Sequence, residues 1–261
     1  MFGMTPEGFA RATKIKQTFG GKPNGIGVPA RHMTILEARD VVVYLAVQWE
    51  FTIKELDISD DMKVIAPKAE EATLVTIEPN TIAGVPFVLD NGKDFPLKPV
   101  TLKFAVVLWR LATLLKDEWG ATRIFTGGIG IGRDDSPGDC HNKGRCVDFF
   151  GADTNRGGFR VERDWGNRTF IRPDKVKTNS WVGYHGKQAF WYRLKHLAGP
   201  PANDAATPFF ETIYKFAQEQ CRDMDGMPTD IGERSFIMHP DHPDPKREQH
   251  RNHIHFQLGA T

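Results

Sequence analysis

Several features that would indicate a protein class are missing from the sequence. No apolar run reaches the ~20 residues that a membrane-spanning helix needs. Residues 1–21 (MFGMTPEGFARATKIKQTFGG) lack the apolar stretch of a secretory signal. The charges nearly cancel, with 34 basic and 33 acidic side chains, so no long-range field favours nucleic acid or anionic lipid. We expect a chain that is made in the cytoplasm without the general export signal, with no membrane insertion and no nucleic-acid partner.

Cysteine is also scarce. The chain has Cys140, Cys146 and Cys221, and an odd, low count is not a disulfide framework. The preferred interpretation is free thiols in a reducing compartment. A bridge between Cys140 and Cys146 stays open as an alternative.

The sequence does contain the material for a folded core, since 40% of its 261 residues are hydrophobic. Apolar residues recur at helical spacing from Ile35 to Phe51, with Thr34 placed as the cap and Glu37 three residues later. A second helix is predicted after Pro99 and should end at Gly120. A third is predicted from Thr207, which we expect to cap it.

Short β-type runs alternate with these helices. They are expected at 121–128, 145–151, 235–240 and 253–258. This order predicts an α+β fold in which helices flank a mainly antiparallel sheet. Residues 1–98 are predicted to form an N-terminal extension or small subdomain of unknown role, and residues 99–261 the main domain.

Two polar clusters point to chemistry. In the last strand, His253 and His255 should share one face while Ile254 and Phe256 face the core. Two imidazoles on one strand face commonly bind a metal, but this pattern alone is weak.

The second cluster is a loop followed by a strand. Gly144 allows a sharp turn between His141 and the strand that carries Asp148. In that strand Val147 and Phe149 should face the core and Asp148 the opposite side. His, Asp and His are ligands of catalytic zinc sites, which keep a fourth position for a water whose pKa falls to about 7.

These two motifs, H141-N-K-G-R-C-V-D148 and H250-R-N-H253-I-H255, resemble those of the zinc peptidases that cleave bacterial cell-wall peptides. That group contains D-alanyl-D-alanine carboxypeptidases and dipeptidases, phage endolysin peptidases and penicillin-insensitive murein endopeptidases, with the Hedgehog domain as a non-enzymatic relation. The spacing of the last three histidines is similar to that of the murein endopeptidases. The resemblance covers residues 99–261.

The resemblance implies a zinc cleft in which His141, Asp148 and His255 hold Zn²⁺. It implies that His253 lies beside the metal and stabilises the oxyanion of the intermediate. His250 is the expected general base, since its ordinary pKa is ~6.5.

Two further residues are weaker candidates. Glu248 is the fallback general base, because Asn252 stands where many members of the family have an acidic base. Arg133 could grip a substrate carboxylate or the oxyanion, although a solvated loop arginine is the simpler interpretation.

The expected activity is hydrolysis of peptidoglycan stem or cross-link peptides by zinc-bound water. An endolysin or a secreted effector fits a cell-wall hydrolase without an export signal. Such a protein would reach the periplasm or wall by a specialised route, and a secretion machine or an immunity protein is then a candidate partner.

Other functions stay open. Cys140, Cys146, His253 and His255 could form a closed structural zinc site without catalysis. The H-R-N-H stretch superficially resembles histidine–asparagine nuclease motifs, but the balanced charge argues against a nuclease. A binding domain of the peptidase fold with an inactive site is the fourth alternative.

Overall fold

The computed structural model describes residues 5–94, 97–129, 140–165, 205–221, 237–240, 250 and 252–258, together with the backbone of four short strands between 168 and 196. The helical elements are α1 (Pro6–Phe19), η1 (Asn24–Gly27), η2 (Ala30–His32), α2 (Ile35–Val47), α3 (Leu102–Trp119), η3 (Val161–Trp165) and α4 (Ala206–Cys221). The strands are β1 (Asp57–Ile58), β2 (Val64–Ile65), β3 (Leu74–Val75), β4 (Thr81–Ile82), β5 (Val85–Leu89), β6 (Val100–Thr101), β7 (Ala121–Ile129), β8 (Cys146–Thr154), β9 (Gly157–Arg160), β10 (Arg168–Ile171), β11 (Tyr184–His185), β12 (Gln188–Ala189), β13 (Arg193–His196), β14 (Ile237–Met238) and β15 (Ile254–Gln257).

The helix ends follow the expected local chemistry. Thr34 and Glu37 form a reciprocal capping box at the start of α2: the Thr34 hydroxyl accepts from the Glu37 backbone N–H at 3.2 Å, and the Glu37 carboxylate accepts from the Thr34 N–H at 2.8 Å. Gly120 adopts the left-handed conformation, with φ of 62°, and ends α3. Both predictions are confirmed.

Within the predicted N-terminal extension, residues 6–19 form the helix α1. One helical prediction needs correction. In α4 the first turn begins earlier than predicted, because the Phe209 N–H donates to the Ala205 carbonyl at 3.0 Å. Thr207 therefore lies inside α4 and does not cap it. No helix in the described part of the chain has both the length and the hydropathy that crossing a membrane requires.

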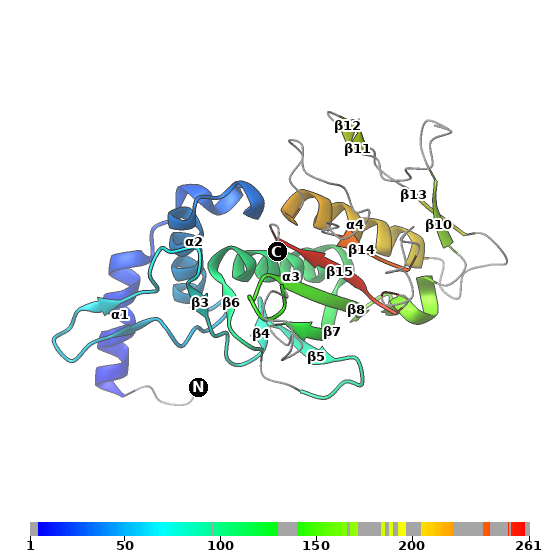
Figure 1. The fold of residues 1–261 in the computed structure, drawn as a ribbon. Coiled ribbons are helices and arrows are strands. Elements are labelled where there is room, and N and C mark those ends of the chain that lie inside the picture. The colour runs from blue at the N-terminus through cyan, green and yellow to red at the C-terminus, as the bar shows by residue number, and fades with distance from the viewer. Residues whose placement is uncertain are drawn as a thin grey trace.

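The central sheet carries its strands in the order β14–β15–β8–β7–β5–β4, with β9 also paired to β8 (Figure 1). Neighbouring strands are antiparallel except β5 and β7, which are parallel. The fold is therefore α+β with a mostly antiparallel sheet, as predicted. The parallel pairing of β5 with β7 was not predicted from the sequence.

Helices α3 and α4 run along one side of this sheet (Figure 1). Phe209 of α4 stacks on Phe159 of β9 with ring centroids 4.2 Å apart, and it also contacts Phe149 of β8. Trp119 of α3 meets Phe209 edge-on at 5.1 Å. These aromatic contacts make the helix-facing side of the sheet the hydrophobic core. Polar side chains of β8 and β15 are left on the opposite side.

The core and the sheet both extend across residue 98. Phe87 of β5 pairs with Ile124 of β7, and the continuous core cluster contains Val42 of α2 as well as Leu108 of α3. The Arg110 side chain of α3 donates to the carbonyls of Ile26 and Val28. Residues on the two sides of 98 are thus packed together, and the division into two folding units stays a prediction.

Candidate metal centre

A tight turn positions the first histidine. The Gly144 N–H donates to the His141 carbonyl at 3.0 Å, and Gly144 has a φ of 64°. A Cβ at this position would lie 2.6 Å from the Pro99 carbonyl oxygen, so both the backbone angle and the space require glycine. The predicted sharp turn is confirmed. It ends directly before β8 and holds His141 above that strand.

The pairing register of β8 and β15 places Asp148 and His255 next to each other. β15 pairs antiparallel with β8 so that His255 lies directly opposite Asp148. Ile254 and Phe256 are fully buried in the core cluster, as are Val147 and Phe149. The predicted alternation is therefore confirmed in both strands. Two segments more than 100 residues apart in sequence place an imidazole and a carboxylate side by side.

Three imidazoles converge on one carboxylate oxygen. Asp148 Oδ1 lies 2.7 Å from His255 Nδ1, 3.4 Å from His141 Nε2 and 3.4 Å from His253 Nε2. Zinc ligands about 2.0–2.1 Å from the metal at tetrahedral angles lie about 3.3 Å apart. The separations to His141 and His253 match that spacing, and of these two residues only His141 belongs to the expected ligand set. The shortest is a hydrogen bond, in which the ring hydrogen occupies the place that a metal would take.

Burial, hydrogen bonds and neighbouring charges together set the pKa values of Asp148 and His253. Burial by itself raises the pKa of Asp148, but hydrogen bonds from His141 and His255 and the charges of His255 and His253 outweigh it, and the pKa lies well below its ordinary value. For His253, burial lowers the pKa, and the Asp148 charge opposes this only in part. The site therefore presents an ionised carboxylate beside a histidine that favours its neutral form, as metal ligation requires.

The other motif histidine joins the cluster. His250 is buried, and its ring centroid lies 4.9 Å from that of His253 and 5.7 Å from that of His255. Asn252 contacts His253 Nδ1 through its Oδ1 at 2.8 Å. An amide oxygen only accepts, so the hydrogen stands on Nδ1 and the Nε2 of the neutral ring keeps its lone pair. Asn252 therefore orients His253. From the sequence alone, Asn252 was notable only because it stands where many members of the family have an acidic base.

The remaining two candidates, Arg133 and Glu248, lie outside the described residues. Their predicted roles as an anion-gripping arginine and a fallback base stay predictions.

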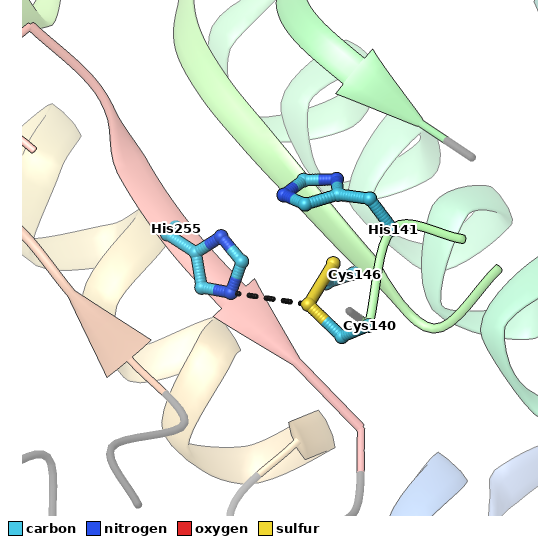
Figure 2. A group of neighbouring side chains, drawn as sticks. All are labelled: Cys140, His141, Cys146 and His255. Atoms are coloured by element: carbon cyan, nitrogen blue, oxygen red, sulfur yellow. Dashed lines mark hydrogen bonds between the residues drawn. A yellow bond between two sulfur atoms is a disulfide. The ribbon is translucent and has the colours of Figure 1, made fainter. Parts of the chain in front are cut away.

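The cysteines also belong to this site. The structure joins Cys140 and Cys146 in a disulfide (Figure 2), so the preferred free-thiol interpretation is wrong for this pair and holds for the buried Cys221. Figure 2 shows His141 and His255 both next to the disulfide, with a dashed line from His255 to Cys140. The ligand atoms of these four residues all lie within 4.8 Å of one another, so the group could hold a metal ion when the two cysteines are thiolates and not joined in the disulfide.

This Cys/His group differs from the closed site considered from sequence, which used His253 where the structure gathers His141. Strand alternation linked His253 to His255 and gave no reason to connect His141 with the cysteines. The signal was present in the spacing, because C140-H-N-K-G-R-C146 places a cysteine at each end of the Gly144 turn. Closing that turn brings both sulfurs beside the histidine.

Comparison with protein-family models finds no matching family, and comparisons with curated proteins and with solved structures find no match either. The functional argument therefore depends on the geometry of the site and on the motif resemblance.

Proposed function

We propose that this protein is a zinc-dependent peptidase that hydrolyses stem or cross-link peptides of peptidoglycan. The observation that supports it most is the convergence of His141, His253 and His255 on one carboxylate oxygen, Asp148 Oδ1. A cluster of imidazoles around an ionised carboxylate is a donor set suited to zinc. A structural ion pair would not need three histidines directed at one oxygen.

In this proposal His141, Asp148 and His255 hold the metal. Zinc bound there would activate a water molecule and polarise the scissile carbonyl. The chain's own contribution is to fix the donors: the Gly144 turn holds His141, and the β8–β15 register holds Asp148 against His255. Because these donors come from paired strands and a glycine turn, their geometry is set before any ligand arrives.

Proton handling falls to the other two histidines. His250 remains the proposed general base, since its ring lies against both His253 and His255. His253 was expected only to stabilise the oxyanion, and its hydrogen bond to Asn252 changes that role. The neutral ring has its lone pair at Nε2, so it must accept a proton there before it can donate to an oxyanion. We therefore assign His253 to receive the proton from the neighbouring base His250 and then to stabilise the developing negative charge.

The choice of peptidoglycan follows from the motif resemblance. Delivery to the periplasm or cell wall, as an endolysin or a secreted effector, is part of the same proposal. So is the involvement of a secretion machine or an immunity protein. The competing proposal, a binding module with an inactive site, shares the fold and predicts binding of peptidoglycan without cleavage.

The test is digestion of purified peptidoglycan by the protein kept free of reductant, followed by mass analysis of the fragments. We expect peptide cleavage that stops after metal removal by a chelator and returns with added Zn²⁺. Asp148→Asn should reduce cleavage and zinc content by more than the about 10–100-fold typical of residues that only orient a ligand.

Asp153→Asn is the matched control on the same strand, because Asp153 pairs with Arg123 and Arg160 and contacts none of the histidines of the site in the described structure. It should retain zinc and activity. Cleavage by fully metal-free protein, or equal losses in the two variants, would overturn the proposal. Binding of peptidoglycan with no new fragments would favour the inactive module.

A further inference from the structure

His255 lies between two groups of potential metal ligands, the Asp148 carboxylate and the cysteine sulfurs. Its Nδ1 faces Asp148 Oδ1 at 2.7 Å, and its Nε2 faces Cys140 Sγ at 3.7 Å (Figure 2). The side chain is 5% exposed, so both contacts are inside the protein. One ring thus connects the carboxylate site of the proposed enzyme to the sulfurs of the disulfide.

This orientation is the one that metal-bound histidines commonly adopt. A ligating imidazole typically donates its other ring N–H to a carboxylate, which fixes the tautomer and directs the lone pair at the metal. Here Asp148 accepts from Nδ1, while Nε2 faces Cys140 Sγ at 3.7 Å and also the Gln257 amide oxygen at 3.3 Å, a contact that metal binding would replace. A sulfur and a nitrogen that share a tetrahedral zinc lie about 3.6 Å apart, given bond lengths of about 2.3 and 2.0–2.1 Å. The observed 3.7 Å agrees.

We propose that reduction of the Cys140–Cys146 disulfide creates a second, closed zinc site formed by Cys140, His141, Cys146 and His255. Four protein ligands leave no position for water or substrate, so this site is not catalytic. It uses the same two histidines as the proposed catalytic set, and the two sites exclude each other. Its regulatory consequence, a latent reduced enzyme and an active oxidised one, rests on the proposed peptidase function, whereas the metal site does not.

The redox step is an ordinary thiol–disulfide exchange. A small dithiol supplies two electrons and two hydrogens, the S–S bond breaks, Cys140 and Cys146 become thiols, and the dithiol becomes a disulfide. On metal binding the two thiols release their protons to solvent. The sulfurs must then separate to about 3.8 Å, the spacing of two thiolates on tetrahedral zinc. The Gly144 turn between them is the segment that adjusts.

The two states match the conditions of two compartments. A reducing cytoplasm favours the dithiol and hence the closed site, while an oxidising exterior favours the disulfide. Cys221 does not enter this exchange, because it is buried in the core and burial raises the pKa of its thiol. A hydrolase of this kind would carry its metal in latent form until it leaves the compartment where it was made.

The test uses the full chain and Co²⁺ as the probe, because thiolate ligation gives cobalt an intense charge-transfer absorption in the near ultraviolet. The protein is reduced with dithiothreitol, freed of reductant by anaerobic gel filtration and titrated with Co²⁺. We expect one Co²⁺ with the thiolate band in the reduced form, and no thiolate band in the oxidised form.

Three variants sharpen the result. The double variant Cys140→Ser, Cys146→Ser should lose the band, and the matched control Cys221→Ser should keep it. Asp148→Asn should keep the band at saturating Co²⁺, with an affinity reduced about 10–100-fold, because in the reduced site Asp148 only orients His255. The Cys221→Ser and Asp148→Asn arms stay informative even if the double variant does not fold.

Absence of the thiolate band in the reduced wild type, or its loss in Cys221→Ser, would overturn the inference. Peptidoglycan cleavage that is equal in the two redox states would overturn the latency while leaving the peptidase proposal intact. A thiolate band in the reduced form with no cleavage in either state would support the closed site and refute the peptidase proposal instead.

Discussion

At the scale of single residues, the chemistry of the site is decided by what each ring nitrogen contacts. Asn252 Oδ1 accepts from Nδ1 of His253, which leaves the Nε2 of that ring as an acceptor. Asp148 accepts from Nδ1 of His255, whose Nε2 faces both Cys140 Sγ and the Gln257 amide oxygen. Neither contact is visible in the motif spacing, which treats the histidines as equivalent. The same residue type is therefore expected to serve as ligand and as proton acceptor within one cluster.

The lowered pKa of His253 predicts acid sensitivity of the metal-free protein. An unfolded histidine titrates near 6.5, while burial lowers the pKa of His253 in the folded state below that value. As the pH falls below 6.5 the unfolded chain binds the proton first, so the free energy of unfolding decreases until the folded pKa is passed. Asp148, whose pKa is lowered from 3.8, adds its own loss only at more acidic pH.

Urea denaturation of the metal-free protein at a series of pH values below 6.5 measures this effect. The His253→Gln variant should show a shallower decrease in unfolding free energy over that range, because the titrating group is gone. Identical slopes in the variant and the wild type would contradict the assignment.

At the scale of elements, the turn from Cys140 to Gly144 and the β8–β15 pair form the frame of the site. The Gly144 carbonyl accepts from the Thr101 N–H at 2.9 Å, which ties the turn to β6 at the start of α3. The Leu258 N–H donates to the Arg145 carbonyl at 2.9 Å and extends the strand pairing up to the turn. Backbone hydrogen bonds from Thr101 and Leu258 thus hold the turn in place and fix the position of His141 relative to the sheet.

Gly144→Ala should therefore lower both the stability of the protein and its affinity for zinc. A side chain in the left-handed conformation costs about 1–2 kcal/mol, and here the added Cβ also meets the Pro99 carbonyl at 2.6 Å. Urea denaturation and a competition titration of zinc against a chromophoric chelator measure the two effects.

Gly92→Ala is the matched control. Gly92 also has a positive φ, of 78°, but no atom within 4 Å of its added Cβ. It should show the backbone cost alone and unchanged zinc affinity. Equal zinc affinities in the two variants would show that the turn does not position His141.

At the scale of the whole molecule, the N-terminal residues complete the sheet that carries the site. β5 provides the parallel partner of β7, and α2 packs its buried face, including Val41 and Leu45, into the same core as α3. The Ala30 N–H and the Arg110 guanidinium both donate to Gln220 Oε1, which joins the N-terminal segment to α3 and α4. The chain before residue 98 is thus structurally continuous with the rest.

A fragment of residues 99–261 is therefore expected not to unfold cooperatively. It would expose the α2-facing side of α3 and the open edge of β7, which are costly to leave in water and prone to association. Urea denaturation followed by circular dichroism measures cooperativity, and addition of the 1–98 fragment should restore a sharp transition. A cooperative transition of the 99–261 fragment alone would instead establish the two predicted folding units.

The sequence by itself determined the local features. Capping chemistry located the start of α2 and the end of α3, and period-two alternation correctly put Asp148 and His255 on the polar side of their strands. These features depend on neighbouring residues only, and so a single sequence contains the needed information.

Only the tertiary structure decided how distant segments meet. The disulfide beside His141, the orientation of His255 between carboxylate and sulfur, and the β5–β7 pair all join residues whose partners are set by the packing of the whole chain. Strand pairing fixes such distances through backbone register, and register between remote strands is settled by the shared core and not by local pattern.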